Sequence, residues 1–163
     1  MPNSCNSISK LISILFLVSL GSCTSISDST FSEKVFMGKL SLTDPQNRSN
    51  FNIKVKAFPE NVIIQIGKPL FGNLLKIQFN YSSGLSFNQK IDNRYLSALK
   101  EFKNKDYRKF LYSCFNDFDI NEKVFILKKN NIGFECIHHD KDTLLINFFY
   151  ENEINFDGVL KRG

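Results

Sequence analysis

Tryptophan is absent from this 163-residue sequence, and alanine occurs only at Ala57 and Ala98. Lysine and asparagine are frequent instead, a balance that is typical of an AT-rich coding bias rather than of one function. The net charge of +5 is therefore weak support for a nucleic-acid partner, although basic chains often have one. We assign the basic excess to a solvated surface, with attraction to anionic lipid headgroups as a secondary alternative.

The common signatures of catalysis are also missing. The sequence has no Gly-X-Ser-X-Gly motif, no glycine-rich phosphate loop and no constellation of paired carboxylates, so we do not expect an enzyme. His138 and His139, followed by Asp140 and Asp142, come nearest to a metal-site pattern. Adjacent residues of a strand point to opposite faces, and a third ligand at suitable spacing is lacking. We therefore expect no metal and no other cofactor.

The longest apolar run, Leu11 to Leu20, has about half the length that spans a bilayer. It follows a short polar segment ending at Lys10, and it fits the apolar region of a secretory signal. The next residues, Leu20-Gly21-Ser22-Cys23, resemble the lipobox of bacterial lipoproteins. That resemblance implies cleavage before Cys23 and acylation of this residue. The alternative is an ordinary signal peptide with a cysteine nearby.

Several acyl chains together hold a protein firmly on a membrane. By resemblance to enteric lipoproteins, an aspartate after the cysteine would retain the protein in the inner membrane, and Thr24 stands there instead. We expect the protein on the outer membrane, facing the periplasm, where it meets no nucleic acid. Residues 1–22 are then the signal peptide, the Ser/Thr-rich residues 23–33 a flexible tether, and residues 34–163 one domain without internal repeats.

Apolar and polar residues alternate along the first half of this domain, which predicts five consecutive strands that share one apolar face. Such strands form an antiparallel meander. The apolar faces are Phe36, Gly38, Leu40 and Leu42; Phe51, Ile53, Val55 and Ala57; Val62, Ile64 and Ile66; Leu75, Ile77 and Phe79; and Leu85 with Phe87.

The pattern then becomes helical from Asn93 to Phe115, and Lys103 to Asp106 divide this stretch into two helices because Asn and Asp compete for backbone hydrogen bonds. Strand patterns return near the end of the chain, at Val124 to Leu127, Ile132 to Ile137, Thr143 to Phe149 and, more weakly, Phe156 to Leu160.

The stretch GKPLFGNLLKI, from Gly67 to Ile77, joins two of the predicted strands. Pro69 and Gly72 are turn residues, so the segment between them is a surface loop. Its tip carries Leu70 and Phe71, two large apolar side chains that are normally buried. Either they project into solvent, or Leu70 folds back as a core or hairpin residue.

The lipobox, the meander and this loop together resemble the LolB-like family of outer-membrane lipoprotein insertion factors, over roughly Val35 to Phe115. Pro69 and Leu70 match the family's Pro-Leu, and Phe71 is an insertion before the matching Gly72. The family's later Gly-Leu-Pro-like turn and tryptophans have no counterpart here. The resemblance implies an α+β fold, an unclosed antiparallel β half-barrel covered by α-helices on its concave side, with an apolar cavity between.

The same resemblance implies a function. A monomeric receptor would accept cargo lipoproteins from a soluble periplasmic carrier, hold their acyl chains in the cavity and insert them into outer-membrane lipid. In this interpretation Pro69, Leu70 and Phe71 form the membrane-inserting loop. The alternative is an envelope lipoprotein of the same fold that binds another lipid or scaffolds an envelope complex.

Two further sets of residues leave alternatives open. Phe79, Phe87, Phe102 and Phe110 are candidates for the lining of an acyl cavity, or they fill an ordinary core. Outside the predicted signal peptide and lipobox, the cysteines are Cys114 and Cys136, which either form a disulfide in the oxidising periplasm or remain buried thiols.

Overall fold

The structure, a computed structural model, describes residues 33–89, 93–116, 124–151 and 154–163. The predicted signal peptide, the predicted lipidation residue Cys23 and nearly all of the predicted tether lie outside these ranges. Within the described residues, no helix is both long enough and apolar enough to cross a membrane.

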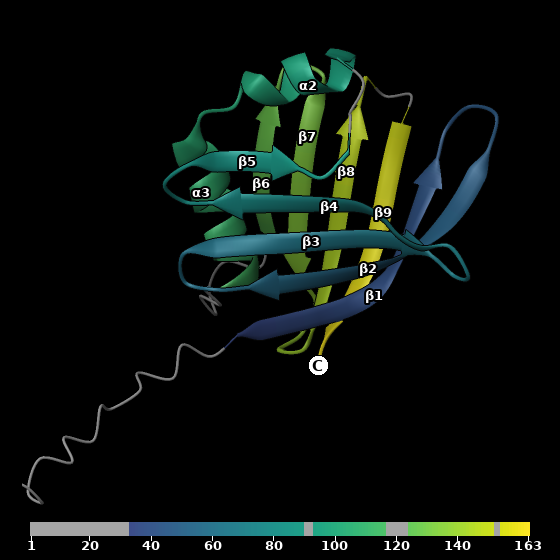
Figure 1. Ribbon diagram of the computed structural model, residues 1–163, viewed down its shortest axis with the longest axis horizontal. Coiled ribbons are helices and arrows are strands. Elements are labelled where there is room, and N and C mark those ends of the chain that lie inside the picture. Colours follow the sequence, from purple (N-terminus) through teal and green to yellow (C-terminus); the bar gives the residue numbers. More distant parts are fainter. Residues whose placement is uncertain (1–32, 90–92, 117–123, 152–153) are drawn as a thin grey trace, which may run out of the picture. The chain divides into compact units, whose positions relative to one another are not determined.

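The described residues form two helices and a nine-stranded sheet (Figure 1). The strands are β1 (Lys34–Thr43), β2 (Arg48–Ala57), β3 (Asn61–Lys68), β4 (Gly72–Asn80), β5 (Gly84–Phe87), β6 (Val124–Lys129), β7 (Ile132–His138), β8 (Thr143–Tyr150) and β9 (Ile154–Arg162). The helices α2 (Asn93–Lys100) and α3 (Asn104–Phe115) connect β5 to β6.

All neighbouring strands are antiparallel, in the order β5-β4-β3-β2-β1-β9-β8-β7-β6. The sheet is curled into a half-barrel. In Figure 1, β2 to β5 run roughly horizontally and β6 to β9 run roughly vertically. The two meanders join where β9 pairs with β1. Strands β1 and β9 approach closely at Gly38, where a Cβ atom would lie 1.8 Å from the carbonyl oxygen of Val159. A side chain at this position would therefore push the two central strands apart.

The predicted alternation is confirmed by the register of the strands. One row of apolar residues is directly paired across β1 to β5, namely Phe36, Val55, Ile64, Ile77 and Phe87. Because side chains alternate between faces, this row and its equivalents in β6 to β9 share the inner face of the curled sheet. The outward positions of the same strands carry most of the charged residues, such as Lys54 and Lys76.

The predicted division into two helices is also confirmed, but the break lies at residues 101–103. Helix α2 ends at Lys100 and α3 begins at Asn104, so Asn104 to Asp106 belong to the first turn of α3. The backbone N–H of Lys103 donates to the Asp106 carboxylate over 3.0 Å, which caps the start of α3. Helix α3 packs against the inner face, because the Phe115 ring lies 5.6 Å from the ring of Phe36 and the Tyr107 ring 5.7 Å from that of Phe79. The fold is thus mostly β, a half-barrel with one helix packed inside it.

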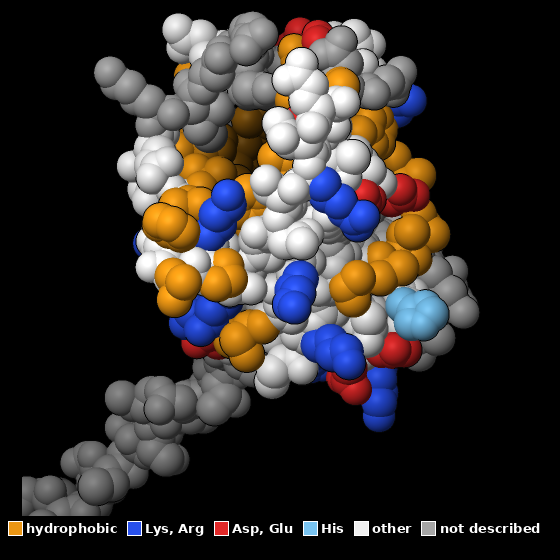
Figure 2. All heavy atoms as spheres, turned by 90° about the vertical axis from the view of Figure 1, so that its right-hand side faces the viewer, with side chains coloured by type: hydrophobic (Ala, Val, Ile, Leu, Met, Phe, Trp, Pro, Cys, Tyr) orange, Lys and Arg blue, Asp and Glu red, His pale blue; other side chains and the backbone are white. Residues whose placement is uncertain are grey.

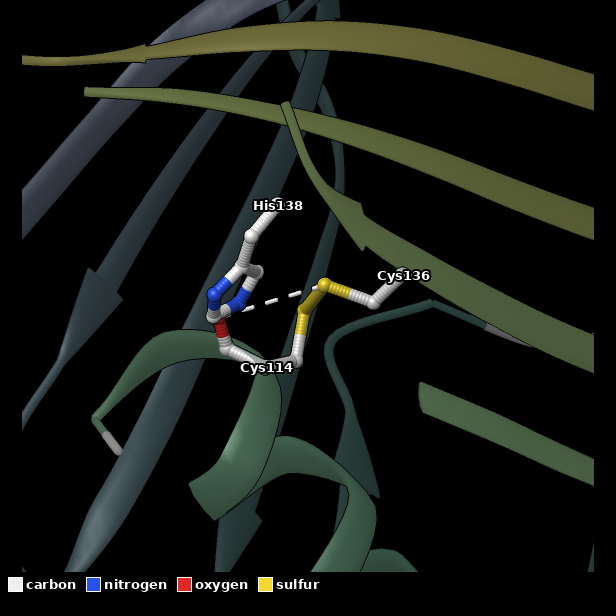
Figure 3. The surroundings of a disulfide bond; sticks show 3 residues. All are labelled: Cys114, Cys136 and His138. Atoms are coloured by element: carbon white, nitrogen blue, oxygen red, sulfur yellow. Dashed lines mark hydrogen bonds between the residues drawn. A yellow bond between two sulfur atoms is a disulfide. The ribbon is translucent and has the colours of Figure 1, made fainter. Parts of the chain in front are cut away.

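Cys114 of α3 and Cys136 of β7 form a disulfide, with Cα atoms 5.8 Å apart (Figure 3). Of the two alternatives that the sequence leaves open, the structure therefore shows the bridge. Both residues are fully buried. The bond fastens α3 to the half of the sheet that follows it in the chain.

Candidate functional site

Burial of the inner face falls from one end of β2 and β3 to the other. On β2, Val55 and Ala57 are fully buried, whereas Phe51 at the opposite end is only half-buried. On β3, Val62 is buried and Ile66 is half-buried. The first end lies beneath α3, and we call it the closed end. The second, which the described residues leave partly uncovered, is the open end.

Apolar side chains of the open end are contributed by both halves of the sheet. We define the trough as six half-buried, inward-facing residues that extend from the row of Val55 to the open end: Phe51, Ile64, Ile66, Ile77, Phe148 and Phe156. The ring of Phe148 lies 5.6 Å from that of Phe156 and 4.9 Å from that of Phe134. Figure 2 shows a hollow near the top of the view, with hydrophobic side chains in its depth. The inner face therefore offers an apolar surface that its own helix leaves partly free.

The four phenylalanines predicted to line a cavity divide into two pairs. Phe79 and Phe102 are buried in the core, with rings 5.7 Å and 5.4 Å from that of Tyr107. Phe87 and Phe110 are half-buried, and the Phe110 ring lies 6.1 Å from Phe134. The sequence analysis did not single out the trough residues. Alternation places them on the inner face but does not indicate how far along the barrel the helix reaches.

The predicted surface loop projects from the open end, between β3 and β4. Leu70 is fully exposed and Phe71 is 76% exposed, so Leu70 does not fold back into the core. The backbone N–H of Phe71 donates to the carbonyl oxygen of Lys68 over 3.2 Å. Leu70 has a φ of 72° and Gly72 a φ of 71°, so this turn uses two left-handed conformations. It holds two large apolar side chains in solvent.

His138 and His139, the histidine pair noted in the sequence, lie at the closed end. Nε2 of His138 donates to the carbonyl oxygen of Cys114 over 3.0 Å, beside the disulfide (Figure 3). The ring also contacts that of Phe125, while His139 is exposed in the following turn. Among the described residues, no three His, Cys, Asp or Glu side chains are grouped closely enough to hold a metal.

Burial lowers the pKa of His138 below its usual value of 6.5, and the hydrogen bond to the Cys114 carbonyl partly opposes this shift. The folded chain therefore binds this proton more weakly than the unfolded chain. Its contribution to stability is complete above pH 6.5 and is lost as the pH falls below that value. We expect urea denaturation of His138→Gln to depend less on pH between 8 and 5 than that of the wild type. His139→Gln is the control, and an unchanged profile in His138→Gln would contradict the assignment.

A separate polar pocket of about 360 Å³ lies between the end of α2 and the β6–β7 turn. Its polar groups bond to one another: Nζ of Lys129 donates to the Glu101 carbonyl oxygen over 2.7 Å, and the Asn130 amide donates to the Glu101 carboxylate. This mutual pairing explains the pocket without a ligand, so the trough and the loop are the candidate site.

The comparisons with known proteins assign no function to this site. The chain matches no protein-family model and no curated protein sequence.

Proposed function

We propose that this protein is an outer-membrane lipoprotein that accepts lipoproteins from a periplasmic carrier, holds their acyl chains in the trough and inserts them into the outer membrane. The observation that carries the proposal is the half-buried apolar inner face at the open end, together with the exposed loop that projects from the same end. The lipobox-like segment ending at Cys23 and the Pro69-Leu70 match to the LolB-like family support the same function.

The trough has the chemistry that an acyl chain requires. Its residues are aliphatic or aromatic and half-buried, and each methylene that leaves water contributes about 0.8 kcal/mol. A chain of a dozen or more methylenes can therefore gain several kcal/mol even when the trough covers only part of it. In this proposal the helices act as the cover of the concave side, with α3 filling the closed end and the acyl chains lying beyond it.

The loop supplies the contact with the membrane. Leu70 and Phe71 expose apolar surface without any partner among the described residues, and their transfer into a bilayer would cost the folded protein no internal contact. The lipid on Cys23 would keep the receptor on the periplasmic side of the outer membrane. Cargo would move down a gradient of apolar affinity from carrier to trough to bilayer. No covalent bond is made or broken, so the proposed role is not enzymatic and needs no cofactor.

A transfer assay tests the proposal with a matched pair of variants. Residues 23–163 with Cys23→Ser would be mixed with a cognate carrier loaded with a fluorescent lipoprotein, and transfer to the receptor and then to liposomes would be measured. Phe148→Glu places a carboxylate in the trough, whereas Phe149→Glu changes the neighbouring residue, which faces outward. We expect Phe148→Glu to weaken cargo binding at least about tenfold, and Phe149→Glu to bind as the wild type does.

Urea denaturation of both variants would show whether each remains folded. Equal loss of cargo binding in two folded variants would argue against the trough. A wild-type chain that takes cargo from no cognate carrier, yet binds a free acyl probe, would contradict lipoprotein insertion and favour an envelope protein that binds another lipid.

A further inference from the structure

The charges on the inner face of the half-barrel have one sign. Among the described strand positions that face inward, there is no aspartate or glutamate. Basic residues occupy inward positions at the strand ends, namely Lys34, Lys68, Lys129 and Arg162. The apolar surface is thus bordered by cations, and a ligand with a negative group at one end would meet no strand carboxylate there.

Lys68 differs from the other lysines of this border by its contacts. The ammonium groups of Lys34 and Lys129 donate to the backbone carbonyls of Asn116 and Glu101, over 2.5 Å and 2.7 Å. Lys68 lies at the open end, and its ammonium is 5.2 Å from the centre of the Phe51 ring. Among the residues that the structure describes, no carboxylate forms an ion pair with it.

The contact with Phe51 places the charge at the margin of the trough. Phe51 faces inward, because it pairs with the buried Leu40 of β1. The aromatic ring attracts the ammonium and supports its aliphatic stem, which leaves the donors of the ammonium free to bind a second partner. Lys68 is also the last residue of β3 before the exposed loop. An amphiphile that lay along the trough would therefore bring its polar end close to this side chain.

We propose that Lys68 binds the anionic head group of an amphiphile whose acyl chain lies in the trough. This inference rests on the proposed binding of acyl chains, and it adds a preference for ligands whose polar end has a net negative charge, from a carboxylate or from a phosphate that no cation of the same head group balances. Such a group could belong to an anionic phospholipid or to a fatty acid, and the two sources are separated by the experiment below.

The experiment compares three ligands with the same chain, each displacing a fluorescent acyl probe from residues 23–163 with Cys23→Ser at pH 8. They are palmitoyl lysophosphatidylglycerol, which is anionic, palmitoyl lysophosphatidylcholine, which is zwitterionic, and palmitate. We expect Lys68→Gln to weaken binding of the anionic ligands about tenfold, as for loss of one charge-assisted hydrogen bond, and to change binding of the zwitterionic ligand less than about twofold. Lys68→Arg should restore binding.

Lys76→Gln is the matched control, because Lys76 lies on the adjoining strand but pairs with outward-facing Gln65. A loss confined to lysophosphatidylglycerol would identify a phospholipid, and a loss confined to palmitate would identify a fatty acid. Equal effects of Lys68→Gln on all three ligands, or none, would overturn the head-group site while leaving the trough intact. If the wild type binds no ligand of the set and no acyl probe, the trough and the proposed function fail together with this inference.

Discussion

Replacing both Leu70 and Phe71 by glutamate is expected to weaken binding of the mature chain to phospholipid vesicles at least about 100-fold. Each side chain gains about 1.5–3 kcal/mol when it enters an apolar phase, and each 1.4 kcal/mol is a factor of about ten in binding. Both side chains are exposed in the folded protein, so the substitutions should leave its stability unchanged. Flotation of residues 23–163 with Cys23→Ser on vesicles measures this effect without the proposed lipid anchor.

The matched control is the pair Val124→Glu and Ile126→Glu. These two β6 residues are also apolar and exposed, at 47% and 63%, but β6 forms the edge of the sheet opposite β5. We expect this control to bind vesicles as the wild type does. If both double variants lost binding equally, exposed apolar surface in general would explain the result, and the loop would have no special role.

Removing the disulfide with Cys114→Ala and Cys136→Ala should lower the free energy of unfolding by about 3 kcal/mol. The bridge closes a loop with a sequence separation of 22, and without it the unfolded chain gains the entropy of that loop. The double variant keeps small side chains at both buried positions, so most of the effect should come from the missing cross-link. Urea denaturation of the oxidised wild type and the variant gives the difference directly.

Chemical reduction supplies the control for this second prediction. A thiol reductant should bring the wild type close to the double variant and should leave the variant unchanged. A wild type whose unfolding does not respond to complete reduction would show that α3 is held by its apolar contacts alone. Those contacts include the ring pairs of Tyr107 and Phe115 with the sheet.

The first meander and the divided helix could be predicted from sequence because their signals are local. The alternation that includes Phe36 and Val55 gives both the strand and its inner face, and the residues around Lys103 mark the helix boundary. The pairing of β9 with β1 could not be predicted in this way. The pattern of β9 is weak, and its partner lies at the other end of the domain, where only tertiary packing selects it.

In the candidate site, too, some features follow from local sequence signals and others depend on tertiary packing. Pro69 and Gly72 place Leu70 and Phe71 in a surface loop, but whether Leu70 projects or folds back could not be predicted from that turn. By contrast, Phe148 and Phe51 face inward with the same alternation as Phe79, and their different burial depends on where α3 ends. The position of Lys68 above an aromatic ring involves a partner from another strand, so no local pattern indicates it.

The central place of β9 has a consequence for how the chain acquires its structure. β1 and β9 are adjacent in the sheet although nearly the whole domain separates them in sequence. Pairings between such distant segments slow folding, because the chain loses the entropy of closing a long loop before the stabilising contacts form. A chain that emerges from a translocation channel in its N-to-C direction cannot join its two meanders until residues 154–162 have appeared. In the proposed exported protein, the half-barrel would therefore complete its folding only after residues 154–162 have left the channel.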